Sequence, residues 1–277
     1  MRKVELANGV TVPAIGLGTW YMGERQSERA AEVAVLRAGI EAGATLIDTA
    51  EMYASGGAEE VVGEAVRGRR DEVFLVSKVL PSNASRQGTR RALEASLRRL
   101  GTEYLDLYLL HWRGAVPFKE TLEVLQALQV EGKIRGYGVS NLDLRAMKEW
   151  SALDRQGGTL TDQVQYSIDE RGIDFDLVPW CREQGIAIMA YCPLSQGRLP
   201  ERPGLAEVAK RHGATAAQIM LAWVTRHPHV IAIPKSASVA RTEENVAAGD
   251  IVLTVEDLAI LDRDFPPPAH AKPLAMT

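Results

Sequence analysis

Short apolar runs alternate with longer amphipathic segments along most of the chain. The runs are rich in Val, Ile and Leu, as in buried strands, and the amphipathic segments repeat apolar residues at helical spacing. Segment 28–42, for example, carries Val33, Leu36 and Ile40 and stops at Gly43. The apolar runs predict strands at 15–18, 45–48, 73–77, 105–110, 137–140, 163–166, 187–191 and 230–234. The amphipathic segments predict helices at 28–42, 58–68, 85–100, 118–130, 143–153, 174–184, 215–226 and 239–247, the seventh opened by a capping box of Thr215 and Gln218.

This regular alternation defines the fold class. Consecutive strand ends lie mostly about 25 to 33 residues apart, which is the length of one βα unit. Eight such units favour an α/β fold of the closed (β/α)8 barrel type, or TIM barrel, built by residues 1–277 as a single domain. An open doubly wound sheet is the alternative, but no G-x-G-x-x-G sequence follows the first strand.

Three elements are expected outside the barrel. Residues 4–13 alternate apolar and polar side chains around Asn8-Gly9, which predicts an N-terminal β-hairpin with positive φ at both turn residues. Extra helices are expected at 203–211 and at 255–263, before a short proline-rich tail.

Composition narrows the range of partners. Lys and Arg number 32 against 36 Asp and Glu, with the signs interspersed, so no basic patch for nucleic acid or an anionic membrane is expected. The two cysteines, Cys181 and Cys192, are too few for a disulfide framework and have no zinc spacing. The N-terminal residues lack the apolar stretch of a signal peptide, and no apolar run approaches about 20 residues. We therefore expect a cytoplasmic protein with no metal site. We also expect it to be a monomer.

Four titratable side chains are predicted to meet at one rim of the barrel. Active sites of such barrels lie at the carboxyl ends of the strands, where the sequence places Asp48, Lys78 and His111. Tyr53 follows in the loop after Asp48, and neighbouring strands are about 5 Å apart. A phenol donates a proton near neutral pH if a nearby ammonium lowers its pKa and a carboxylate holds that ammonium. The four groups together predict a site for carbonyl reduction.

Each of these residues also has a simple structural interpretation. Asp48 could cap a helix, Lys78 could be solvated, Tyr53 could pack on the rim, and His111 could be a hydrogen-bonded rim histidine. Four chemically matched groups at one rim are nevertheless improbable by chance.

The chain resembles the aldo-keto reductases over nearly its whole length. The segments that carry the resemblance are the opening hairpin, residues 16–20, 47–50 with Tyr53, Ser77-Lys78, 110–112, 138–141, 190–194 and 233–236, followed by Arg241 and Glu244-Asn245. Within the family, residues 51–63 and 75–81 are most similar to bacterial reductases of the methylglyoxal reductase kind.

The resemblance implies an NADPH-dependent enzyme that reduces small aldehydes and ketones. Tyr53 would donate the proton, and Lys78 and Asp48 would tune the acidity of Tyr53. His111 would orient the substrate carbonyl, and the nicotinamide would supply hydride. The cofactor residues implied are Tyr191 under the nicotinamide ring, Ser140, Asn141 and Gln163 at its carboxamide, Lys235, Ser236, Ser238 and Arg241 at the 2′-phosphate, and Glu244 and Asn245 at the adenine. Pro193 and Leu194 would also bind the cofactor. Trp20, Met52 and Trp112 would form the carbonyl pocket. Without the resemblance, these residues could equally be polar turn residues, buried core aromatics and solvent-exposed charges at the start of a helix.

Some positions depart from the family pattern. The loop at 54–57 is longer than in many members, Cys192 stands where serine is frequent, and the tail after Phe265 is short. A short tail predicts an open pocket for varied small carbonyls.

Two other functions compete with the reductase. One is a cofactor-binding regulatory or sensor subunit on the same barrel, against which the complete set of four catalytic residues argues. The other is a metal-dependent or sugar-phosphate isomerase, which needs carboxylate or histidine ligands on several strands. Only Asp48 and His111 qualify, and Lys78 between them would repel a metal.

Overall fold

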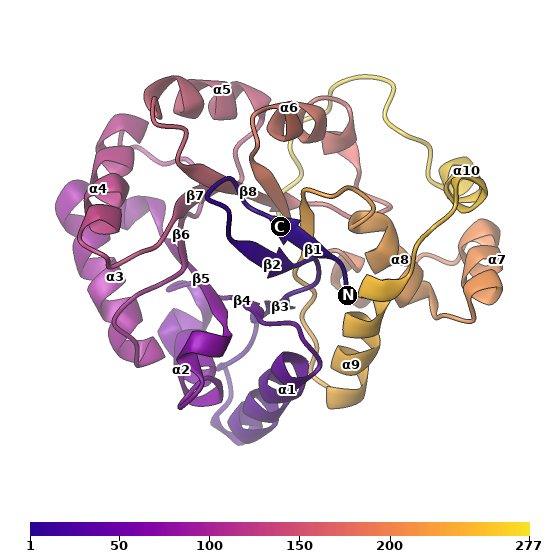
Figure 1. The fold of residues 1–277 in the computed structure, drawn as a ribbon, viewed down its shortest axis with the longest axis horizontal. Helices are drawn as coiled ribbons and strands as arrows, with labels where there is room; N and C mark the ends of the chain where they lie inside the picture. Colours follow the sequence, from indigo (N-terminus) through magenta and orange to yellow (C-terminus); the bar gives the residue numbers. More distant parts are fainter.

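Eight parallel strands form a closed barrel, as predicted. The computed structural model describes residues 1–277, and the strands run in the order β3 to β10 with each hydrogen-bonded to the next. Their bounds are β3 Leu17–Gly18, β4 Leu46–Asp48, β5 Phe74–Val79, β6 Leu107–Leu110, β7 Tyr137–Ser140, β8 Thr159–Gln165, β9 Ala187–Tyr191 and β10 Val230–Ala232. A bridge between Ile15 and Ala232 joins the first strand to the last, and the amide of Gly16 donates to the carbonyl of Ala232 at 2.8 Å. Figure 1 shows the resulting ring of strands within a ring of helices.

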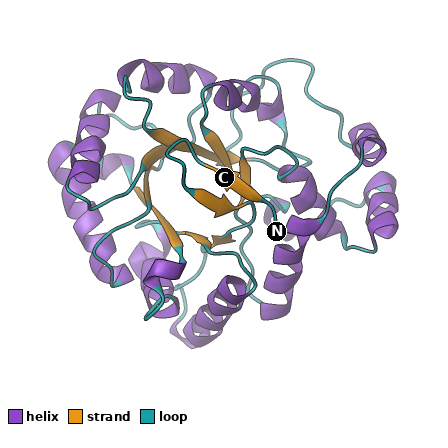
Figure 2. Ribbon diagram, viewed as in Figure 1, coloured by secondary structure: helices purple, strands orange, loops and turns teal.

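Helices surround the barrel and separate successive strands (Figure 2). They are α1 Arg29–Glu41, α2 Gly57–Ala65, α3 Arg86–Leu100, α4 Phe118–Val130, α5 Leu144–Leu153, α6 Leu177–Glu183, α7 Pro203–His212, α8 Ala216–Val224, α9 Val239–Ala247 and α10 Val255–Asp264. Short 3-10 turns lie at Gln26–Glu28, Tyr53–Gly56, Arg70–Glu72, Pro81–Asn83, Gly172–Asp174, Ser195–Gly197 and Ala248–Asp250. The predicted capping box opens α8, and both extra helices, α7 and α10, are present.

Six of the eight strands have bounds that differ from the prediction, mostly by one or two residues, and the differences in β8 and β5 bear on the site. β8 begins at Thr159, four residues early, because the buried Thr159 and Thr161 interrupt the apolar pattern although threonine suits a strand. β5 continues to Val79, so Lys78 lies inside the strand and faces the barrel site.

The N-terminal hairpin closes the end of the barrel opposite the carboxyl ends of the strands. It comprises β1 Lys3–Glu5 and β2 Thr11–Pro13, which pair antiparallel and cross the barrel opening in Figure 1. Val4 and Val12 belong to one buried apolar cluster with Leu46 and Val76 of the barrel strands. This packing removes the interior of the barrel from water on that side.

The hairpin turn differs from the expected geometry. Only Gly9 has positive φ, at 79°, and its amide donates to the carbonyl of Leu6 at 2.8 Å. The Asn8 side chain instead accepts from the amide of Val10 at 3.2 Å. The prediction of two left-handed residues was therefore wrong, because a wider loop needs only the glycine in that conformation.

The C-terminal segment returns to the barrel. Residues 266–277, called the tail below, leave α10, pass α6 and end near the middle of the barrel in the view of Figure 1. No helix in the structure combines the length and the apolar character that crossing a membrane requires.

Candidate active site

Lys78 is the centre of a buried hydrogen-bonded group at the carboxyl ends of β4 and β5. Its ammonium donates to Oδ2 of Asp48 at 2.8 Å, to the carbonyl of Thr49 at 2.9 Å and to the hydroxyl of Tyr53 at 3.0 Å. The Lys78 side chain has no exposed surface, and that of Asp48 is 3% exposed. An ammonium withdrawn from water in this way needs all three acceptors, and together they fix its position.

Nearby charges and burial have opposite effects on the pKa values of Lys78 and Tyr53. Burial acts to lower the pKa of Lys78, but the nearby Asp48 carboxylate and Tyr53 phenol outweigh it, so the pKa of Lys78 is raised and the side chain stays cationic. Burial raises the pKa of Tyr53, although Lys78 acts to lower it. The sequence-based expectation of a net lowered Tyr53 pKa was therefore wrong, because burial dominates. The phenol keeps its proton at neutral pH and can donate it.

Tyr53 is held by a strained turn. Ala54 and Ser55 have φ of 49° and 53°, which L-residues rarely adopt. Glu51 fixes the preceding residues, because its carboxylate accepts from the amide of Leu80 at 2.7 Å and from Asn83 at 3.0 Å. This conformation points the phenol back toward the end of β5.

The loop is also secured from α2. The fully buried Glu59 accepts from Ser77 at 2.6 Å and from Arg99 at 2.6 Å. Glu51 and Glu59 were both missed in the sequence analysis, because carboxylates on a loop and a helix look like ordinary surface charges.

His111 lies beside Tyr53. It follows β6, and its ring centroid is 5.9 Å from that of Tyr53 with the planes at 75°. Burial and the charge of Lys78 lower the pKa of His111 to about 2, and its Nδ1 is buried without a hydrogen-bond partner. The imidazole is neutral at physiological pH and suits a hydrogen bond to a carbonyl oxygen.

Polar side chains line the ends of the next three strands, β7, β8 and β9. Asn141, with φ of 57°, donates from Nδ2 to the carbonyl of His111 at 3.1 Å and accepts from the Tyr191 hydroxyl at 2.9 Å. Ser140 donates to the carbonyl of Gln163 at 2.8 Å, and Gln163 Nε2 lies 2.7 Å from Oδ1 of Asp48. These contacts connect the predicted cofactor residues directly to the catalytic group.

A single cavity of about 790 Å³ contains almost all of the predicted site. The predicted residues on its wall are Trp20, Asp48, Met52, Tyr53, His111, Trp112, Ser140, Asn141, Gln163, Tyr191, Pro193, Leu194, Lys235, Ser236, Arg241, Glu244 and Asn245. Lys78 lies behind the wall, where it supports Asp48 and Tyr53. Ser238 is also absent from the wall, and its backbone is instead hydrogen-bonded to Ser236.

The two cations at the end of the cavity away from the catalytic group are free of internal partners. Lys235 and Arg241 are exposed and form no ion pair within the chain. Glu244 accepts from Thr215 at 2.6 Å, which directs its carboxylate toward α8. This end of the cavity is therefore able to accept an anion.

Sequence reasoning missed several wall residues, above all those of the tail. Met276 and Thr277 line the cavity together with Tyr191 and Cys192. The expectation of a pocket left open by a short tail was wrong, because the tail reaches the catalytic end. Its residues show no periodicity that would have indicated this. The structure contains no group of three or more His, Cys, Asp or Glu side chains arranged to hold a metal ion.

Comparisons with known proteins agree with this geometry. The sequence profile of the aldo/keto reductase family matches residues 14–263. The chain is 51% identical to methylglyoxal reductase YeaE of Escherichia coli over 99% of both chains, and 36% identical to glyoxal reductase of Bacillus subtilis over 94% of this chain and 91% of that protein. A crystal structure of an aldo/keto reductase from Klebsiella pneumoniae in complex with NADP and acetate superposes with a TM-score of 0.97 at 53% identity, covering 100% of this chain and 99% of that one. The chain therefore belongs to the aldo/keto reductase family.

Proposed function

We propose that this protein reduces small aldehydes and ketones, with 2-oxoaldehydes such as methylglyoxal as the preferred class, at the expense of NADPH. The observation that carries the proposal is the Tyr53 hydroxyl, protonated and 3.0 Å from the Lys78 ammonium, on the wall of a cavity that also contains a neutral His111. The two relatives named above are a methylglyoxal reductase and a glyoxal reductase.

The cavity has the properties that a dinucleotide requires. About 790 Å³ lies within the usual range for cofactor pockets. Asn141 and Gln163, near the catalytic group, would hold the nicotinamide carboxamide, and Tyr191 would lie against its ring. The unpaired Lys235 and Arg241 at the other end would bind the 2′-phosphate, which favours NADPH over NADH. The bound cofactor supplies the hydride.

The side chains of this protein supply the proton and the orientation. As hydride reaches the carbonyl carbon, negative charge develops on the oxygen, and Tyr53 protonates that oxygen to give the alcohol. Lys78 stabilises the phenolate that remains, and Asp48 keeps Lys78 in place. His111, being neutral, donates a hydrogen bond to the same oxygen without competing as an acid.

The catalytic end of the cavity favours small, weakly polar carbonyls. Its wall includes Trp20, Met52, Trp112 and Met276, and the ring of Trp20 stacks on that of Tyr21 with centroids 4.5 Å apart. No cation at this end lies ready to bind a substrate phosphate, because Lys78 is buried behind Asp48 and Tyr53. A sugar phosphate would therefore lose its hydration without gaining a partner.

The whole chain is proposed to act as one catalytic domain, as a monomer and in the cytoplasm. In support, its exposed large apolar side chains are distributed over many different elements, and both cysteines are unpaired.

Steady-state oxidation of NADPH by the purified protein tests the proposal. We expect a larger kcat/KM for methylglyoxal than for glyceraldehyde 3-phosphate, and activity that disappears in Tyr53→Phe. A better rate with the sugar phosphate contradicts the substrate class. Tight NADPH binding without turnover of any carbonyl favours the sensor subunit instead.

A further inference from the structure

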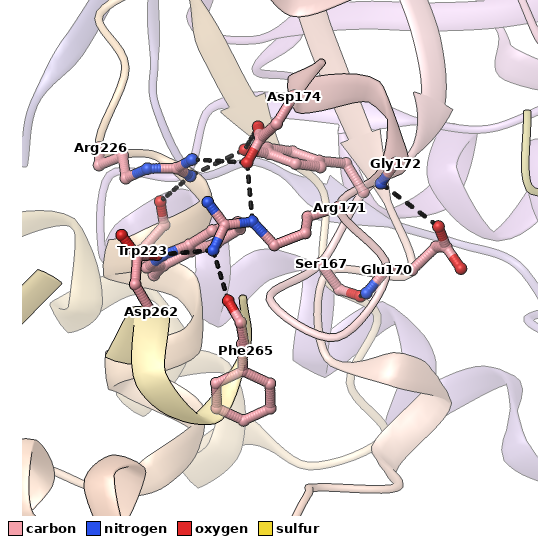
Figure 3. A network of polar contacts seen from close by, with 10 residues as sticks. Ser167, Glu170, Arg171, Gly172, Asp174, Trp223, Arg226, Asp262 and Phe265 are labelled. Carbon is pink, nitrogen blue, oxygen red and sulfur yellow. Dashed lines mark hydrogen bonds and ion pairs between the residues drawn. The ribbon is translucent and has the colours of Figure 1, made fainter. Parts of the chain in front are cut away.

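The loop between β8 and α6 contacts the tail far from the catalytic residues. We call residues 167–174 the support loop. Its main side chain is Arg171, whose contacts with Asp174, Asp262 and Phe265 are drawn in Figure 3. None of these residues lines the cavity, so the catalytic mechanism does not use them.

Arg171 fixes the point from which the tail departs. Its Nη1 donates to Oδ1 of Asp262 at 2.6 Å and to the carbonyl of Phe265 at 2.6 Å, while its Nε donates to Asp174 at 2.9 Å. Phe265 is the first residue after α10, so this guanidinium closes the helix end and directs the chain that follows. The Arg171 side chain is 11% exposed and lies 4.7 Å over the ring of Trp223, which holds it rigidly.

The support loop contacts the tail a second time near the end of the tail. A Cβ atom placed on Gly172 would lie 3.4 Å from Cβ of Lys272, so the two backbones pass close together. Four residues later, Met276 enters the cavity wall, followed by Thr277. The tail is thus fixed at its start and near its end by one loop.

The tail has few other contacts, among them the packing of Leu274 against the main apolar core. Residues 266–277 form no helix or strand, and most of their side chains are exposed. Fixing a segment of this kind costs conformational entropy, and the free energy to offset that cost must come from a few anchoring contacts. Arg171 makes one of these, because it is charged and nearly buried and donates to the carbonyl of Phe265, the residue directly before the tail.

From this arrangement we infer that Arg171 is a positioning residue for the carbonyl substrate, acting through the tail that forms one wall of the catalytic end. The inference rests on the proposed reductase function. When the tail is released, substrate binding must also order Met276 and Thr277, which weakens the binding of substrate. The cofactor residues Lys235 and Arg241 and the proton donor Tyr53 remain in place, so NADPH affinity and the chemical step are left nearly unchanged.

Arg226 provides a matched control within the same network. It donates to Asp174 at 3.0 Å and to the Tyr166 hydroxyl at 2.8 Å, and its guanidinium lies 3.6 Å from the Trp223 ring. It makes no hydrogen bond to α10 or to the tail. A substitution there perturbs the network without releasing the tail.

The experiment compares Arg171→Met, Arg171→Lys and Arg226→Lys with a chain that ends at Phe265. We expect Arg171→Met and the shortened chain to raise KM for methylglyoxal about 10-fold, which corresponds to about 1.4 kcal/mol. The dissociation constant of NADPH and kcat should change by less than about twofold, and Arg171→Lys should restore part of the loss. In the shortened chain, Arg171→Met should not raise KM further, because both changes remove the same ordered wall of the cavity.

Amide hydrogen exchange provides a measurement that does not depend on turnover. Residues 266–277 should exchange faster in Arg171→Met than in Arg226→Lys or the wild type. If Arg171→Met does not fold, Asp262→Ala replaces it. The Asp262 side chain is 44% exposed, so its loss disturbs the core little, and it is one of the partners that hold Arg171.

Three outcomes overturn the inference: unchanged exchange of the tail in both the Arg171 and Asp262 variants, an equal rise of KM in Arg226→Lys, or additive effects of Arg171→Met and the shortening. A wild-type protein that turns over no carbonyl contradicts the proposed function instead, and the exchange data still show whether Arg171 anchors the tail.

Discussion

The carboxylate of Asp48 and the ammonium of Lys78 lie 2.8 Å apart with almost no solvent access. Lys78 is withdrawn from water, and Asp48 is its one carboxylate partner. Removing either charge therefore leaves the other buried without compensation, so this pair links the stability of the protein to its chemistry.

Replacing Lys78 by Met should lower the free energy of unfolding by about 3 to 5 kcal/mol and abolish turnover, because Asp48 is then buried unpaired. Adding Asp48→Asn should recover much of the stability but none of the activity. Urea unfolding and NADPH oxidation of the two single variants and the double variant measure both effects. Equal loss of stability in the single and double variants would contradict the pairing.

Tyr53→Phe should lower kcat by at least about 10²- to 10⁴-fold, the usual contribution of a general acid, while NADPH binding remains nearly intact. Cofactor binding is read from quenching of tryptophan fluorescence. Tyr21→Phe is the matched control, because Tyr21 lines the same cavity but makes no hydrogen bond to Lys78. Near-normal kcat in Tyr53→Phe would remove the phenol from the mechanism.

Arg241→Ala should weaken NADPH binding by roughly 10- to 100-fold and leave NADH binding little changed. One charge-assisted hydrogen bond to a phosphate is worth about 1.5 to 3 kcal/mol, and NADH has no phosphate at that position. Arg90→Ala, on the far side of the barrel in α3, serves as the control for a general change of charge. Equal weakening of both cofactors would assign Arg241 to the adenine or to the fold.

His111 should make the protein less stable as the pH falls. Its pKa is about 2 in the folded chain, against about 6.5 when unfolded, so below pH 6.5 the unfolded chain binds a proton that the folded chain does not. This contribution is constant above pH 6.5 and reaches a loss of about 2 kcal/mol at pH 5.

Urea unfolding of the wild type and His111→Asn at pH 5 and pH 7 isolates this effect, because the other titrating groups are common to both. The loss between the two pH values should be smaller in His111→Asn. His227, whose pKa is lowered to about 4, contributes in the same direction in both proteins. Identical pH dependence of the two proteins would mean that His111 is accessible to protons in the folded state.

The barrel and the catalytic contacts were predictable because they follow from local pattern and strand order. Asp48 and Lys78 had to meet, since their strands are consecutive and parallel strands place their carboxyl ends together. The net direction of the Tyr53 pKa was not predictable in this way. It depends on how completely the phenol is buried, which is a property of the whole fold.

The role of the tail was also hidden from the sequence. Its path is set by the bond of Arg171 to Phe265, 94 positions apart in the sequence, and by the passage of Lys272 beside Gly172. Such contacts leave no periodic pattern in either segment. The turn at Asn8-Gly9 shows a smaller limit of the same kind, because loop length, fixed by strand pairing, decided which residue became left-handed.

The N-terminal hairpin, at the end of the barrel opposite the cavity, also offers a site for chemical attachment. Asn8 is exposed at the tip of the turn, and unlike Gly9 it does not have the positive φ that favours glycine. A tether attached to this tip would hold the protein on a solid support with its catalytic mouth facing the solution. Reactants would then reach an immobilised catalyst as freely as they reach the dissolved protein.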